Sequence, residues 1–175
     1  MNSESRKAIN EIAEIIIDTL EVAVPITNLE NMVKTLGGKI VKRDELKDGA
    51  EGKIYRDGEG FVIEIPKTYN TYRERFTIAH ELGHLFLHMG YAINEEQWDR
   101  NKNNVYLRKE VGEMEYQAHE FAAALLMPRE TFFEQMNENY NGDGTYLMNN
   151  VAAYFEVSLE SAINRGRWLG ILSWG

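Results

Sequence analysis

The sequence contains no cysteine among its 175 residues. Disulfide frameworks, cysteine-ligated zinc, iron–sulfur clusters and cysteine nucleophiles are therefore excluded. Positive charge is also scarce, since 19 Lys and Arg stand against 28 Asp and Glu, a formal net charge of −9. Binding to phosphates requires clustered basic side chains, so this balance argues against a nucleic acid or an anionic membrane surface as the main partner.

Long apolar runs are missing as well. No run approaches the roughly 18 residues of a membrane-spanning helix. Acidic residues interrupt the apolar positions of residues 1–21, a pattern that does not fit a signal peptide. We therefore expect a cytoplasmic protein without a membrane partner. Apolar residues still make up 43% of the chain, which is enough for the sizeable core of one ordinary domain.

The apolar spacing and the turn residues predict an α+β fold. Helices are expected near residues 4–22, 28–36, 69–89, 110–127, 129–137, 145–155 and 158–168, and strands near 39–42, 52–55 and 61–65. The last two strands should form a hairpin around residues 57–58, and residues 90–104 should form a polar loop. The turn cluster at residues 141–144 suggests a boundary between a main domain, 1–140, and a C-terminal helical extension, 141–175, packed on it.

The sequence HELGH at residues 80–84 is the strongest chemical signal. On a helix, positions four apart lie on one face about 6 Å apart, so His80 and His84 can converge on one metal ion. Glu81 is offset around the helix and can reach a metal-bound water as a general base. Neutral imidazoles in a tetrahedral site with one open position suit Zn²⁺. A glycine inside this helix, Gly83, would let another backbone approach closely.

The alternative to a metal site is that two histidines occur four residues apart by chance on an amphipathic helix. The chain has only four histidines, and three of them lie on this one predicted helix. The third, His88, would lie about 12 Å along the helix axis from His80, so one ion cannot bind all three. We expect His88 to be structural and hydrogen-bonded near the helix end.

A third metal ligand should come from the helix that ends before Pro128. A helical wheel at about 100° per residue puts Glu115 and His119 within or at the edge of the buried face. It puts Gln117 and Glu120 on the opposite, solvated side. A carboxylate on a buried face requires a cation, which favours Glu115 as the ligand. His119 would then orient a ligand, although it could itself be the ligand of a three-histidine site, or could simply hydrogen-bond Glu115.

Two stretches together, RFTIAHELGHLFLH at 75–88 and EYQAHEFAAALLMP at 115–128, resemble the ImmA/IrrE family of zinc metallopeptidases. The similarity extends over nearly the whole chain. It implies a compact zincin-like domain with His80, His84 and Glu115 as zinc ligands and Glu81 as the catalytic acid/base. Family members are cytosolic proteins of bacteria and mobile elements, and several cleave helix-turn-helix repressors in gene regulation.

This sequence departs from the family pattern at two positions on the second stretch. His119 stands where the family usually has Asn or Asp, which leaves the ligand set open. Gln117 stands where many members have Glu. Because the wheel turns Gln117 away from the site, we expect that change to have little effect.

Residues 151–165 have the spacing of a helix-turn-helix, so they either bind DNA or form a helical pair that completes the core. Residues 151–175 carry two acidic and two basic side chains, and Gly166 weakens the second helix. We therefore expect no direct DNA binding. The strand at 61–65 should border the cleft, where it either offers an edge to a peptide or is an ordinary buried strand.

Together these features predict an α+β zincin-like domain, with a small, mainly antiparallel sheet packed on helices and a C-terminal helical pair. The predicted function is limited, Zn²⁺-dependent cleavage of a regulatory protein, with a repressor as the expected substrate. The alternative is a metal-containing, antitoxin-like regulator that binds protein with little peptidase activity. A binding module has no need of Glu81, which favours the enzyme. Tyr91, Tyr106 and Tyr116 are the candidates for stabilising the oxyanion.

Overall fold

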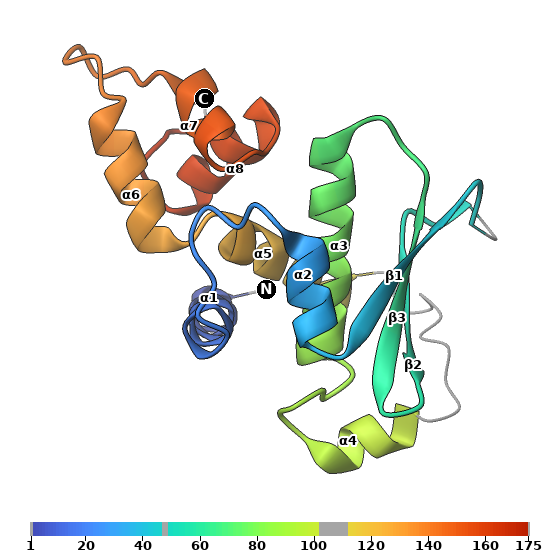
Figure 1. The fold of residues 1–175 in the computed structure, drawn as a ribbon. Coiled ribbons are helices and arrows are strands. Elements are labelled where there is room, and N and C mark those ends of the chain that lie inside the picture. Colours follow the sequence, from blue (N-terminus) through green and yellow to red (C-terminus); the bar gives the residue numbers. More distant parts are fainter. Residues whose placement is uncertain (1, 47–48, 102–111, 175) are drawn as a thin grey trace.

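The computed structural model describes residues 2–46, 49–101 and 112–174 (Figure 1). Within these ranges the chain forms eight helices and three strands. In chain order they are α1 (Ser3–Thr19), α2 (Leu29–Thr35), β1 (Gly38–Arg43), β2 (Lys53–Asp57), β3 (Gly60–Pro66), α3 (Thr71–Leu87), α4 (Glu95–Arg100), α5 (Glu113–Leu126), α6 (Arg129–Glu138), α7 (Met148–Tyr154) and α8 (Leu159–Trp168). The α+β class and the C-terminal helical pair are confirmed.

The sheet is small and mixed, with the strand order β1-β3-β2. β2 and β3 are antiparallel and form the predicted hairpin, whereas β1 runs parallel to β3. Only one of the two strand pairs is thus antiparallel. Of the two alternatives left open for this strand, β3 is the ordinary buried strand and offers no edge, because it is hydrogen-bonded on both sides. Its side chains Phe61, Val62, Ile63 and Ile65 are each at most 1% exposed, which is typical of a central strand.

Helix α3 lies between the sheet and α5 (Figure 1). It approaches α5 tightly at Gly83, where an added Cβ would lie 3.0 Å from Ala118 Cα and 3.1 Å from the Ala118 carbonyl oxygen. The predicted close approach of a second backbone at Gly83 is thus confirmed. Ala118 and Ala122 of α5 are completely buried. This tight contact brings the first turn of α5 next to the histidines of α3.

One helix was missed by the sequence. Residues 95–100 form α4 inside the region predicted as a polar loop, and residues 102–104 of that region lie outside the described part of the chain. The Asn94 side chain accepts a hydrogen bond from the Gln97 amide and caps the helix. Trp98 is 8% exposed and packs edge-on against Tyr91. With six residues and one buried side chain, α4 is too short to produce a recognisable apolar periodicity in the sequence.

The C-terminal helices lie on the far side of α5 from the sheet (Figure 1). Phe155, Val157 and Ala162 are buried, so α7 and α8 add to the core. None of the described helices is both long enough and apolar enough to cross a bilayer. The division of the chain at residue 140 stays a prediction.

A buried polar cluster ties α8 to α1 and α5. Arg165 donates to the Met127 carbonyl (3.0 Å), to Glu120 Oε1 (3.2 Å) and to Asn10 Oδ1 (2.8 Å). Burial lowers the pKa of Arg165 to about 10, so the guanidinium stays charged at neutral pH. Glu120 also accepts from Arg6 at 3.1 Å and is 7% exposed. Its prediction as a solvated residue was therefore wrong.

Candidate metal centre

The HELGH residues lie in the C-terminal half of α3, a 17-residue helix capped by the Asn70 side chain. His80, Glu81 and His84 are 4%, 2% and 3% exposed. Burying three ionisable groups together is costly unless they bind one another or a cation. The burial thus marks this helix face as a site rather than as a solvated surface.

Three potential ligand side chains converge where α3 meets the first turn of α5. Nε2 of His80 lies 3.1 Å from Nε2 of His84. The Glu115 carboxylate places Oε2 3.2 Å from the first nitrogen and Oε1 3.2 Å from the second. Bonds of about 2.0–2.1 Å to a tetrahedral zinc would put ligand atoms about 3.3 Å apart. The two imidazoles and the carboxylate therefore fit a zinc ion in both chemistry and spacing.

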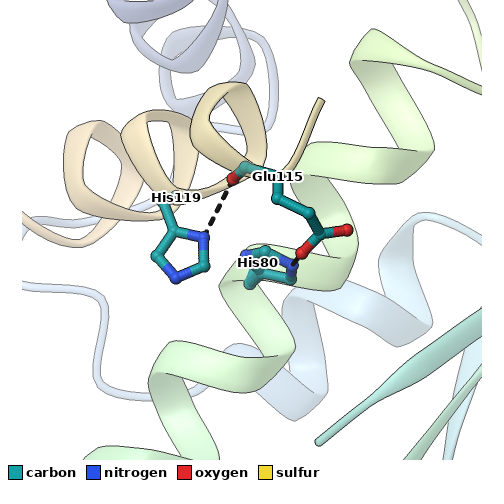
Figure 2. Close-up of side chains that lie close together, drawn as sticks. All are labelled: His80, Glu115 and His119. Atoms are coloured by element: carbon teal, nitrogen blue, oxygen red, sulfur yellow. Dashed lines mark hydrogen bonds and ion pairs between the residues drawn. The ribbon is translucent and has the colours of Figure 1, made fainter. Parts of the chain in front are cut away.

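His119 lies one turn further along α5 and faces His80 (Figure 2). Its ring centroid is 4.6 Å from that of His80, and its Nδ1 donates to the Glu115 main-chain carbonyl at 2.9 Å. One ligand atom each from His80, Glu115 and His119 can be chosen within 4.8 Å of one another. The structure thus brings all the predicted ligand candidates together. It leaves open whether His119 orients a ligand or binds the ion.

Glu81 lies against the start of β2. A Cβ added to Gly52, the residue before that strand, would lie 2.4 Å from Glu81 Oε1. Only a glycine therefore lets the chain pass so close to the carboxylate. The sequence did not predict this contact, since its only signal was a glycine at the first position of a predicted strand. It places the proposed base at the junction of α3 and the sheet.

His88 caps the C-terminus of α3 and lies behind His84. The two Nδ1 atoms are 2.9 Å apart, and His88 Nε2 is 2.9 Å from Gln117 Oε1 of α5. Burial lowers the pKa of His88, which favours the neutral imidazole. The prediction that Gln117 faces away was wrong. The wheel assumed one buried face, but α5 packs against α3 on one side and α1 on another.

The three tyrosines predicted as candidates for stabilising the oxyanion differ in their surroundings. The Tyr91 hydroxyl donates to the Leu36 carbonyl, and its ring packs on Phe61 and Trp98, so it belongs to the core. Tyr106 lies outside the described residues. Tyr116 is 69% exposed and lies one residue after Glu115. Of the described candidates, only Tyr116 is free of a core role.

A cavity of about 440 Å³ opens beside His119. Its wall includes the apolar side chains of Phe76, Ala123, Met127 and Trp168. Arg6 and Tyr116 add polar groups to the wall. His119 lines this cavity and also contacts His80, so it lies between the cavity and the candidate metal centre.

Comparisons with known proteins agree with this geometry. Residues 33–166 match the model of a peptidase family, M78, described as the IrrE N-terminal-like domain. A search of curated proteins found no match. Among solved structures, the chain resembles a Mycobacterium tuberculosis transcriptional regulator, with a TM-score of 0.59 and 18% identity. The match covers 92% of this chain but 46% of that protein, and it shows a shared fold.

Proposed function

Because this chain belongs to the IrrE N-terminal-like family of M78 peptidases, we propose that it is a zinc-dependent endopeptidase that makes limited cuts in a regulatory protein. A helix-turn-helix repressor is the proposed substrate. The observation that carries the proposal is the convergence of His80, His84 and Glu115 at 3.1–3.2 Å, with Glu81 buried beside them. A protein that only bound metal would have no use for this second carboxylate.

Each of these residues has a separate role in the proposed peptide hydrolysis. His80, His84 and Glu115 hold the ion. Zinc, when bound, supplies a Lewis acid and lowers the pKa of water. Glu81 accepts a proton from the attacking water and delivers it to the nitrogen of the leaving amine. The closeness of the Glu81 carboxylate to the Gly52 backbone supports this role, because it leaves little room for the carboxylate to move away.

Two features support a peptide as the substrate. Among the described strands, β2 pairs only with β3, and it starts next to Glu81, so a substrate segment can add along its outer edge. The cavity beside His119 is lined by Phe76, Met127 and Trp168 and has room for an apolar side chain of that segment. Backbone pairing and a single side-chain cavity together fit a limited, selective cut.

The experiment is a cleavage assay on a library of peptides, with products identified by mass spectrometry. Protein loaded with Zn²⁺ should cut a restricted set of sequences, and removal of the metal by a chelator should stop cleavage until zinc is restored. Candidate repressors encoded beside this gene are then tested as whole proteins. Zinc-loaded protein that binds such a repressor and cuts nothing in either assay would instead support the antitoxin-like binding regulator.

A further inference from the structure

The three histidines of α3 form one row, at positions 80, 84 and 88, but only the first two reach the point where Glu115 converges. The third points its two ring nitrogens elsewhere. Nδ1 of His88 contacts His84, and Nε2 contacts Gln117 of α5, each at 2.9 Å. The Gln117 amide, the His88 ring and the His84 ring are thus connected in series.

The direction of the hydrogen bonds along this series follows from the group at its end, the amide oxygen of Gln117. The oxygen of an amide can only accept a hydrogen bond, so Nε2 of His88 must carry a proton. A neutral imidazole carries one proton, which leaves a lone pair on His88 Nδ1. That lone pair must accept from His84, so the proton of His84 is on Nδ1.

The consequence appears at the opposite nitrogen of His84. With its proton on Nδ1, the ring presents a lone pair on Nε2, the atom that lies 3.1 Å from His80 Nε2 and 3.2 Å from Glu115 Oε1. The other neutral tautomer would carry a proton there and could not bind an ion. Hydrogen bonds to the far nitrogen of a metal-binding histidine fix its tautomer and raise its basicity.

We propose that Gln117 is a positioning residue, which acts through His88 to hold His84 in the tautomer that binds metal. The inference rests on the metal centre of the proposed function, although it does not depend on peptidase activity. It gives the third histidine of the row a defined task. It also means that α5 supplies both a ligand, Glu115, and the anchor of a second ligand, Gln117, two residues apart.

The test compares Gln117→Met, which keeps the size and removes the acceptor, with Gln117→Glu, which keeps acceptor oxygens. Metal-free protein is titrated with Zn²⁺ against a chromophoric chelator. Loss of such a hydrogen-bond partner typically weakens metal binding by about 10–100-fold. Gln117→Met should show a loss in that range, and Gln117→Glu should restore affinity close to the wild type. Thermal unfolding of the metal-free variants reports any general loss of structure.

A second readout examines the tautomer directly. In ¹⁵N NMR spectra of the metal-free protein, His84 should carry its proton on Nδ1 in the wild type and in Gln117→Glu. Gln117→Met should show a mixture of tautomers. The proposal is overturned if His84 has the same tautomer in all three proteins, or if Gln117→Met binds zinc as tightly as the wild type. Suppose that Gln117→Met changes the tautomer of His84 and weakens zinc binding, but the wild type cuts no peptide. That result would refute the peptidase proposal and leave the role of Gln117 standing.

Discussion

At the level of single atoms, Glu115 connects α3 and α5, the two helices of the proposed metal centre. Each of its carboxylate oxygens lies 3.2 Å from a histidine nitrogen of α3, although its side chain is still 26% exposed. His119 is close by, and its Nδ1 donates to the main-chain carbonyl of Glu115. The contact of Glu115 with both His80 and His84 favours the carboxylate as the third ligand and His119 as a residue that orients it or the substrate.

The ligand assignment predicts opposite outcomes for two substitutions. Glu115→Ala should lose tight zinc binding, because it removes a carboxylate that contacts both histidines. His119→Asn, the residue usual in the family, should keep the metal and lose at most about 10–100-fold in affinity. Chelator competition measures both. If His119→Ala strips the metal and Glu115→Ala does not, the centre is a three-histidine site.

The sequence was informative about residues whose role depends on their own helix. The spacing of His80 and His84 follows from helix geometry alone, and a wheel suffices to place Glu115. Gln117 and Gly52 could not be predicted in the same way. Their roles depend on which groups of other elements lie opposite them, the ring of His88 and the carboxylate of Glu81.

At the scale of elements, the site depends on how closely α3 and α5 approach. Gly83 sits at the contact, with the Ala118 backbone 3.0–3.1 Å from the position of an added Cβ. Any side chain there must push the helices apart. Because Glu115 lies one turn before Ala118, such a displacement would also move the carboxylate away from His80 and His84.

Gly83→Val tests this coupling of packing and metal binding. Overpacking a tight contact typically costs about 1–3 kcal/mol, so urea unfolding of the metal-free protein should show a loss in that range. Zinc affinity should fall as well, because Glu115 is displaced. A variant as stable as the wild type, with unchanged zinc affinity, would show that the helix contact does not set the geometry of the ligands.

Helices and strands could be predicted where apolar and polar residues alternate over a long stretch or where turn residues mark a hairpin. α1, α3 and the hairpin of β2 and β3 follow from periodicity and turn residues. On α5 the wheel was right for Glu115 but wrong for Gln117 and Glu120, because α5 packs on α1 as well as on α3. The position of β3 in the sheet also escaped the sequence, since an apolar run does not say whether a strand is central or at an edge.

At the scale of the whole molecule, Arg165 joins the first helix, the metal-centre helix and the last helix. Its guanidinium is 1% exposed and reaches Asn10 of α1, Glu120 of α5 and the Met127 carbonyl. A buried cation with these partners cannot also contact a DNA phosphate. The C-terminal pair therefore carries one fewer available basic side chain than its sequence suggests.

The cluster predicts that Arg165→Met is destabilising while Arg167→Met is not. Breaking a buried ion pair typically costs about 3–5 kcal/mol, and here we expect about 2–4 kcal/mol because Arg6 still contacts Glu120. Arg167 lies over the exposed Trp174 ring, and its loss should cost less than about 1 kcal/mol. Urea unfolding compares the two variants. Equal stabilities would mean that the C-terminal pair is held by apolar contacts alone.

The central claim is that Glu81 is a catalytic base and not a structural carboxylate. The most direct measurement is the cleavage rate of zinc-loaded wild type against zinc-loaded Glu81→Gln, on the same peptide and with the bound zinc measured in both. Glutamine keeps the size and removes the base, so the variant should hold one zinc per chain and cleave about 10²–10⁴-fold more slowly. Equal cleavage rates at equal zinc content would contradict the account.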